Sequence, residues 1–291
     1  MQIVTDSGTD LRLNAGEEEG LNIHTVPLTV TLDEKSYREG IDIQHKDFYD
    51  LLEASGGLPT TSQPSAGEFA EMYRKVAQED PDILSIHITS GLSGTYNAAL
   101  EGAKLVPEAN VTHIDTKTLT AASGWQVYAA ARAIKAGWDK EKILGLVKRI
   151  GDATDCMYTL DELKYLIHGG RISHMKGLIA SMLNLKPLIG VEKVGGTYIQ
   201  LGQTRTFKRA LKGLANLISE QYKHALGSKM MVQVLYSDNH EGGQMLRDMV
   251  DDMFECTWLP MGPMSLVLGA HTGRSMVGVG FCPMDVFSEI P

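Results

Sequence analysis

Residues 83–99 read ILSIHITSGLSGTYNAA, and this stretch decides the fold class. Its first part, residues 83–88, is a short apolar run rich in isoleucine, which is typical of a buried strand. Its second part places Ser90, Ser93 and two glycines directly in front of a helical pattern. A helix start has backbone amides without internal partners and a partial positive charge, so carboxylates and phosphates bind there. A capped turn that binds nothing fits the same residues, and the local sequence leaves both interpretations open.

The first half of the chain alternates short apolar runs with amphipathic stretches. The pattern predicts strands at residues 2–5, 22–31, 83–88 and 111–114, and helices at residues 46–54, 67–78, 95–105, 119–136 and 140–150. This alternation favours a parallel sheet with helices on both faces. In such sheets ligands gather beyond the carboxyl ends of the strands, which is where Asp6, Ser90 and Asp115 fall. We therefore expect three polar loops to converge.

The pattern changes after residue 150 to short strands separated by Gly-rich turns, with helices predicted at 207–225 and 241–253. A chain of 291 residues is long for a single core, which makes two packed units the expectation. The sequence thus predicts an N-terminal α/β domain at 1–153 and a C-terminal α/β domain at 154–291.

Composition narrows the function classes. A net charge of −9 argues against a protein that neutralises nucleic-acid phosphates or lies on an anionic membrane. Apolar runs fall well short of the roughly 18 residues that span a bilayer, and the start MQIVTDSGTD lacks a basic leader, so a cytoplasmic protein is expected. The cysteines, Cys156, Cys256 and Cys282, are few and odd in number, which favours reduced packing residues over a disulfide framework.

A second polar segment, TTSQPSAGEF, begins at residue 60. Ser65 followed by Glu68 is a capping box that predicts a helix start. Pro64 excludes helical geometry at the residue before it. We therefore expect Thr61 and Ser62 on an extended loop, with hydroxyls free to meet a ligand oxygen. An ordinary polar loop before a well-capped helix is the alternative.

Several motifs, in the same order along the chain, resemble those of the DegV family of fatty-acid-binding proteins. They are TDSGTDL, TSQPSAGEF, SGLSGTYNAA, IDT, ELKYLIHGGRIS, LNLKPLIGV, QTRTFKRAL and LGAHTGR, and they spread over essentially the whole chain. The resemblance implies a two-domain DegV-like fold, with an N-terminal parallel sheet flanked by helices and a mixed α/β C-terminal domain. It also implies a long-chain fatty acid between the domains, its tail in an apolar tunnel.

The same resemblance implies a non-catalytic carrier subunit of a bacterial fatty-acid kinase. Such a subunit presents the bound carboxylate to a separate ATP-dependent kinase, receives the acyl phosphate and passes it toward phospholipid synthesis. The fatty acid is then a ligand, and no cofactor is implied.

Carried onto this sequence, the resemblance assigns the carboxylate to Thr61, Ser62, Ser93 and His271, with the amide of Gly94 as a further donor. Neutral hydroxyl partners suit this chemistry, because they leave the acid reactive instead of locking it in a buried ion pair. The family also marks two arginines as contacts for the kinase or the phosphate, Arg171 in GGRIS and Arg205 in QTRT.

One segment departs from the family pattern. Where members commonly read HTGPG, this chain has Arg274 and Ser275 after HTG. Proline would stiffen the turn, so its replacement predicts a mobile cation close to the head group.

Other function classes fit less well. A serine hydrolase could use Ser93, Asp115 and His271 in that order, but Thr95 stands where the nucleophile elbow requires glycine. A dinucleotide-binding fold would need a Gly-x-Gly-x-x-Gly fingerprint after the first strand, and TDSGTDL stands there. For a metal, the spacing of His168 and His174 does not put both on one helix face. No metal site is therefore expected.

Overall fold

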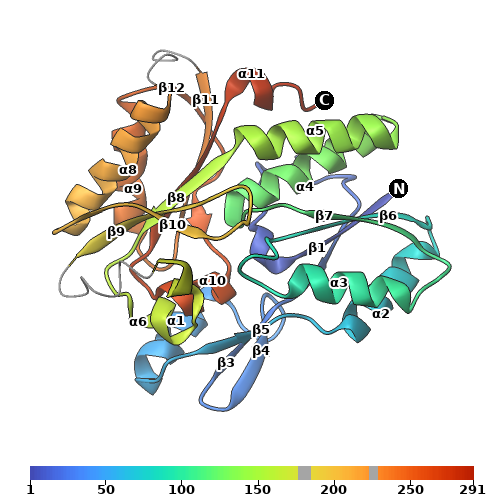
Figure 1. Ribbon diagram of the computed structural model, residues 1–291, viewed down its shortest axis with the longest axis horizontal. Helices are drawn as coiled ribbons and strands as arrows, with labels where there is room; N and C mark the ends of the chain where they lie inside the picture. Colours follow the sequence, from blue (N-terminus) through green and yellow to red (C-terminus); the bar gives the residue numbers. More distant parts are fainter. Residues whose placement is uncertain (176–184, 223–228) are drawn as a thin grey trace.

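The computed structural model describes residues 1–175, 185–222 and 229–291, and shows an α/β protein built on three sheets (Figure 1). The predicted fold class is confirmed: the N-terminal sheet is parallel and the C-terminal sheet is mixed.

The N-terminal sheet has four parallel strands in the order β2-β1-β6-β7. They are β1 (Gln2–Asp6), β2 (Ile23–Val26), β6 (Asp82–His87) and β7 (Asn110–Asp115). Side chains alternate between the faces of a strand, so Val4 packs with α2 (Ala66–Ala77) and α3 (Thr95–Lys104), while Ile3 packs in the cluster that contains α4 (Thr120–Lys135). In Figure 1, α2 and α3 lie on one side of the sheet and α4 on the other.

A small antiparallel sheet, in the order β4-β3-β5, extends from this unit. It consists of β3 (Thr29–Leu32), β4 (Lys35–Arg38) and β5 (Thr60–Ser62), with α1 (His45–Ser55) between β4 and β5. The strand predicted at 22–31 was therefore wrong as one element, because the chain leaves the parallel sheet after Val26 and pairs elsewhere from Thr29. Pro27 lies at the break, and proline cannot donate to a sheet ladder.

The C-terminal sheet follows the order β10-β9-β8-β14-β11-β12, with β13 also paired to β11. Its strands are β8 (Asp155–Thr159), β9 (Lys186–Val191), β10 (Tyr198–Thr204), β11 (Lys229–Tyr236), β12 (Glu255–Trp258), β13 (Gly262–Pro263) and β14 (Val277–Pro283). The strand β11 runs parallel to β12 and β13, and the other pairs are antiparallel. Two helices, α8 (Phe207–Gln221) and α9 (His240–Asp251), pack against this sheet.

Shorter helices complete the described fold. They are η1 (Ser7–Thr9), α6 (Lys164–His168), η2 (Arg171–Met175), α10 (Leu266–Thr272) and α11 (Met284–Phe287). The helices predicted in the first half match the structure within three residues at each end, with α5 at Lys140–Ala153. The predicted helix at 207–225 is described only as far as residue 222, and its end lies outside the described residues. The capping box of Ser65 and Glu68 is confirmed.

The helix α4 lies between the two large sheets. Of its 16 residues, 13 are buried, and it packs against β1 and β6 on one side and β8 and β14 on the other. Small side chains allow this close approach: a Cβ added at Gly280 would come within 2.9 Å of the Ala121 Cβ. Trp125 donates from Nε1 to the Gln233 Oε1 on β11, at 3.0 Å.

One hydrophobic cluster therefore contains residues from both halves of the chain, among them Ile3, Trp125 and Met231. The boundary predicted near residue 153 falls between the end of α5 and the start of β8. The division into domains 1–153 and 154–291 stays a prediction. The three cysteines are free, with Cys156 and Cys282 buried and Cys256 half-buried.

Candidate ligand pocket

The three polar loops at the carboxyl end of the parallel sheet meet, as the sequence predicted. Asp6 Oδ2 accepts a hydrogen bond from the Ile88 amide at 3.1 Å, and Asp115 accepts from the Ser90 amide at 3.2 Å and the Ser90 hydroxyl at 2.5 Å. Both carboxylates are thus engaged by the segment that carries SGLSGT. They fix the course of this loop.

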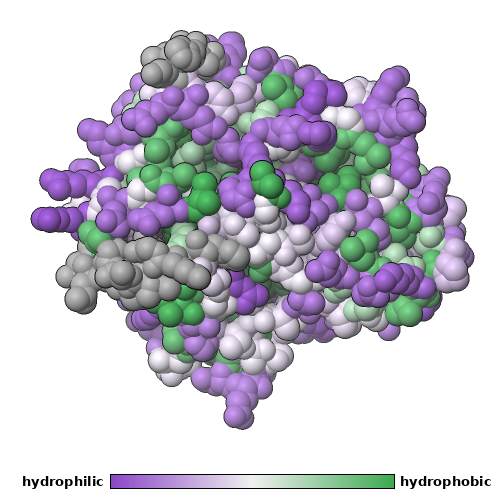
Figure 2. All heavy atoms as spheres, in the orientation of Figure 1, coloured by the Kyte–Doolittle hydropathy of each residue, from purple (hydrophilic) through white to green (hydrophobic). Residues whose placement is uncertain are grey.

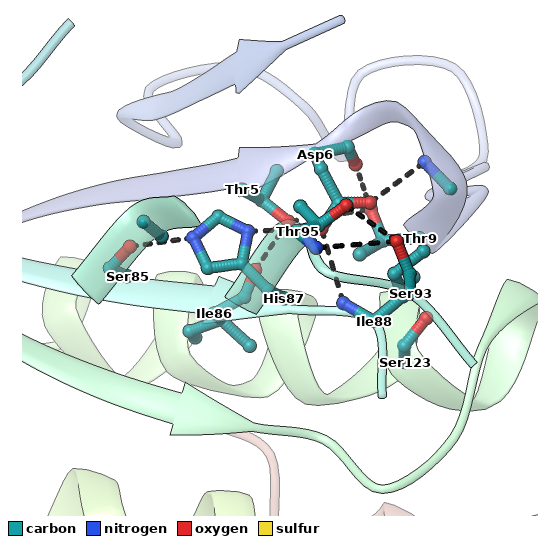
Figure 3. Close-up of polar contacts among 12 residues, drawn as sticks. Thr5, Asp6, Thr9, Ser85, Ile86, His87, Ile88, Ser93, Thr95 and Ser123 are labelled. Carbon is teal, nitrogen blue, oxygen red and sulfur yellow. Dashed lines mark hydrogen bonds and ion pairs between the residues drawn. The ribbon is translucent and has the colours of Figure 1, made fainter. Parts of the chain in front are cut away.

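Asp6 also belongs to a buried polar chain, shown in Figure 3. The His87 Nδ1 lies 2.9 Å from Asp6 Oδ2, and the His87 Nε2 lies 2.6 Å from the Ser85 Oγ. These three residues are 0% exposed. The order acid, imidazole, hydroxyl is that of a hydrolase triad, but complete burial keeps substrates away from Ser85. These three hydrogen-bonded residues instead anchor the end of β6, where the SGLSGT loop begins.

A cavity of about 260 Å³ lies beside this loop. Its polar wall contains five of the residues singled out in the sequence: Thr61, Ser62, Ser93, Arg171 and His271. Most of its other lining residues are apolar, namely Leu28, Ile88, Leu92, Leu119, Tyr198, Val267 and Leu268. We refer to this cavity as the ligand pocket.

Thr61 and His271 form the closest polar contact in the pocket wall, 2.8 Å from Oγ1 to Nε2. Thr61 is on β5, and His271 is in the last turn of α10. Thr61 thus lies on a strand and not on the predicted loop, and its hydroxyl contacts the imidazole while keeping the capacity for a further hydrogen bond. Burial, and then the charges of Arg171 and His168, lower the pKa of His271 to about 4. The ring is thus neutral near pH 7.

Gly169 explains how His271 fits. A Cβ at position 169 would lie 2.0 Å from the His271 Nδ1, so only glycine leaves room for the ring. This glycine belongs to GGRIS, the same segment that brings Arg171 to the pocket.

Ser93 belongs to the SGLSGT loop, and Arg171 forms a hydrogen bond to the same loop. The Ser93 hydroxyl lies 2.8 Å from the Thr95 hydroxyl, as Figure 3 shows, and accepts from the Thr95 amide at 3.3 Å. Arg171 donates from Nε to the Leu92 carbonyl at 3.2 Å and from Nη1 to the Gly169 carbonyl at 2.6 Å. Both acceptors of Arg171 are neutral, so neither cancels its charge.

Gly94 does not line the ligand pocket but a neighbouring polar recess of about 360 Å³. Leu92, Ser93 and Arg171 line both spaces, so the recess adjoins the pocket at these three residues. Gly94 is the residue before α3, and a Cβ there would lie 2.0 Å from the Gln63 Oε1.

The structure also places Arg205, Arg274 and Asp115, three further residues that the sequence singled out. Arg205 is exposed after β10 and is not among the residues that line the pocket or the recess. Arg274 does not line the pocket, where the sequence had led us to expect it, but forms ion pairs with Asp238 and Glu53 and lines a different groove. Asp115 pairs with Ser90 and Lys117 and not with His271. The triad Ser93, Asp115, His271 is therefore not assembled.

Sequence reasoning missed the apolar wall of the pocket. Leu268 lies one helical turn before His271 on α10, and that spacing is the signal that could have placed it there. Tyr198 is buried at the start of β10 and carries no sequence signal of its own.

Further features bear on ligand classes. Among residues 1–175, 185–222 and 229–291, no group of three or more His, Cys, Asp or Glu side chains is placed to hold a metal ion. The side chain of His174 lies outside the described residues. No helix in the described part of the chain combines the length and apolarity of a bilayer-crossing segment. On the face in Figure 2, hydrophobic residues form small separate groups among hydrophilic ones.

Comparisons with known proteins show which family the chain belongs to. The family model described as uncharacterised protein, DegV family, matches residues 1–284. A DegV domain-containing protein of Listeria innocua, lin2658, is 31% identical over 278 residues, which is 95% of this chain and 96% of the relative.

Two solved structures are similar over nearly the whole chain. A fatty-acid-binding DegV family protein of Thermus thermophilus has a TM-score of 0.85 and 27% identity, covering 97% of this chain and 99% of its own. A stearic-acid-binding protein of Eubacterium ventriosum has a TM-score of 0.82 and 26% identity, covering 99% and 100%. With a family model that spans nearly all its residues and relatives that match along the same length, this chain belongs to the DegV family.

Proposed function

We propose that this protein binds a long-chain fatty acid with its carboxylate among Thr61, Ser93 and His271, and its tail along the apolar wall of the ligand pocket. The observation that carries the proposal is that one cavity is lined both by hydroxyl and imidazole side chains and by a set of aliphatic ones. Fatty-acid binding by the Thermus and Eubacterium relatives supports it. The Ser62 hydroxyl, in the same wall, is a further partner for the carboxylate.

The acyl chain supplies most of the binding energy in this proposal. Each buried methylene contributes about 0.8 kcal/mol, whereas a net hydrogen bond contributes about 1 kcal/mol. A cavity of about 260 Å³ lies below the range of roughly 300–1,000 Å³ usual for small-molecule sites. Seating a long tail therefore requires wall residues such as Leu92 and Leu268 to part. Affinity should follow chain length, and the polar end should set the position of the head group.

We further propose that the bound acid is a substrate for a separate ATP-dependent kinase. The polar recess supports this idea, because Ser93 and Arg171 line both it and the ligand pocket. A carboxylate at Ser93 could then be reached from the recess, with Arg171 and the Gly94 amide beside the phosphoryl group. In this scheme the protein is a cytoplasmic carrier without chemistry of its own. Arg205, which is exposed outside the pocket and the recess, would contact the surface of the kinase.

The first test is native mass spectrometry of the protein purified from bacteria. We expect a co-purifying fatty acid, released on denaturation, whose mass gives chain length and unsaturation. Delipidated protein should bind added stearate, and Ser93→Ala should weaken that binding while Arg205→Ala should not. Protein that is empty after purification and does not bind stearate would contradict the proposal.

The second test separates a carrier from a hydrolase. Incubation with a bacterial fatty-acid kinase, ATP and Mg²⁺ should yield acyl phosphate, and Ser93→Ala should lower the yield. Turnover of p-nitrophenyl esters at enzymatic rates, abolished by Ser93→Ala, would favour hydrolysis instead. The structure offers that alternative no support, since Asp115 is bound to Ser90 and Lys117.

A further inference from the structure

A second cavity, of about 480 Å³, lies at the other end of α10 from His271. Its walls come from the TDSGTDL segment, from the connection between β4 and α1, and from the residues that begin α10, Ser265 and Leu266. The lining residues of this second cavity and of the ligand pocket do not overlap. The two cavities are therefore different sites.

Asp10 is a buried acid with an unused oxygen in this wall. It is 8% exposed, and its Oδ1 accepts from the Ser265 amide at 2.6 Å. Its Oδ2 is buried and has no hydrogen-bond partner among the described residues. Leaving a buried oxygen unpaired costs about 1–3 kcal/mol, so a native structure normally supplies a partner.

The other two acids that line the cavity, Asp6 and Glu39, already have hydrogen-bond partners. Asp6 accepts from the Gly8 and Ile88 amides and contacts His87, as described above. For Glu39 the partners lie at the start of α10 and in the first loop. It accepts from the Ser7 hydroxyl at 2.7 Å and the Ser265 hydroxyl at 2.9 Å, and also from the Leu266 amide. Glu39 therefore contributes negative charge to the wall without competing for a ligand hydrogen.

A donor with no partner lines the same cavity. The Arg12 Nε is buried and forms no hydrogen bond with any described residue. His45 lies near it, and burial, followed by the charge of Arg12, lowers the pKa of His45 to about 4. The imidazole is thus neutral near pH 7 and leaves Arg12 as a cation of the cavity wall.

We propose that this second cavity binds a small neutral molecule rich in hydroxyl groups, such as a polyol or monosaccharide. A hydroxyl can accept from an arginine N–H and donate to a carboxylate oxygen, so one placed between Arg12 Nε and Asp10 Oδ2 would satisfy these two atoms. An anionic ligand would suit Arg12 but would face Asp10 and Glu39. A cationic ligand would suit the acids but would face Arg12. The Thr25 hydroxyl and the Gln44 amide, also in the wall, can meet further hydroxyls.

Burial fits this choice. Burial, and then the charge of Glu39, raises the pKa of Asp10 well above its ordinary value. A neutral ligand binds without having to change the charge of such a group, and a hydroxyl can donate to or accept from it in either protonation state.

Ligand-observed NMR with glycerol, erythritol, myo-inositol and glucose tests the proposal on the full-length protein, with inorganic phosphate and ammonium as charged probes. We expect at least one polyol to bind, and Asp10→Asn and Arg12→Gln each to weaken it by about tenfold. Asn tolerates the left-handed backbone at Asp10, where φ is 47°, and Arg12→Gln provides a second variant should the first not fold. Ser93→Ala, in the ligand pocket, is the matched control and should leave polyol binding unchanged.

The proposal is overturned if no polyol binds to the folded protein. It is also overturned if phosphate or ammonium binds in preference, or if Ser93→Ala removes polyol binding while Arg12→Gln does not. Because Ser93→Ala affects only the ligand pocket, failure here is distinguishable from failure of fatty-acid binding.

Discussion

Replacing Thr61 by valine tests how the head group is held, because the change removes one hydroxyl and keeps a β-branched side chain on β5. Thr61 is 2.8 Å from the His271 Nε2, and the proposal also makes it a donor to the carboxylate. Hydrogen bonds to charged groups contribute about 1.5–3 kcal/mol. At the low end of that range, the dissociation constant of stearate should rise about tenfold.

A comparison of fatty acids of different length calibrates this expected loss of affinity. Palmitate lacks two methylenes of stearate, which should cost about 1.6 kcal/mol at about 0.8 kcal/mol each. Thr61→Val with stearate should therefore bind about as tightly as the unmodified protein with palmitate. The head and tail interact with different walls, so the two losses should add when combined.

Isothermal titration of delipidated protein with both acids measures all four combinations. Thr60→Val is the matched control, because Thr60 is the exposed neighbour on the same strand and should leave both constants unchanged. The reasoning is refuted if Thr61→Val leaves stearate affinity intact, or if palmitate and stearate bind equally well. A Thr60→Val variant that weakens binding as much as Thr61→Val would point to a change in the strand and not in the head-group site.

Three further predictions concern stability and the limits of the pocket. The pKa of His271 is lowered to about 4 in the folded protein, so between about pH 6.5 and pH 4 the unfolded chain binds a proton that the folded chain does not. Stability is therefore lost as pH falls through this window. His271→Gln should flatten that part of a plot of Tm against pH, and an unchanged slope would argue against the buried neutral ring. Asp6→Asn alters the buried contact with His87 and should lower the free energy of unfolding in urea by about 3 kcal/mol. A loss below about 1 kcal/mol would mean that this contact does not hold the end of β6 in place. Arg274→Ala removes exposed ion pairs, so it should change stability by less than about 1 kcal/mol and leave stearate titrations unaltered; a clear loss of affinity would place the head group near Arg274.

Local sequence predicted what local physics determines. The capping box at Ser65 and the helical periodicities gave the helix bounds, because caps and amphipathic spacing act within a few residues. The strand break at Pro27 was not predicted, because the apolar pattern continues on both sides of it. Pro27 itself was the available signal, since proline cannot donate to a sheet ladder.

Contacts between residues far apart in the sequence could not be predicted from local patterns. Thr61 and His271 are 210 residues apart, and nothing in either segment alone shows that they meet. Their grouping came from resemblance to a family. Where the chain departs from that family, at Arg274, the expectation failed. The partners of Arg274, Asp238 and Glu53, lie on separate segments whose proximity only the fold determines.

The position of α4 has a consequence for how a tail could enter or leave. In this helix 13 of 16 residues are buried between two sheets, so it belongs to the core of both halves of the chain. Moving the halves apart would remove its contacts with one sheet or the other. Exposing so much packed surface would cost far more than a few kcal/mol. Entry of the tail should therefore require only a local movement of a few side chains or one short segment. A fragment ending at residue 153 would expose the apolar face of α4 that packs on the C-terminal sheet, and we expect such a fragment to self-associate.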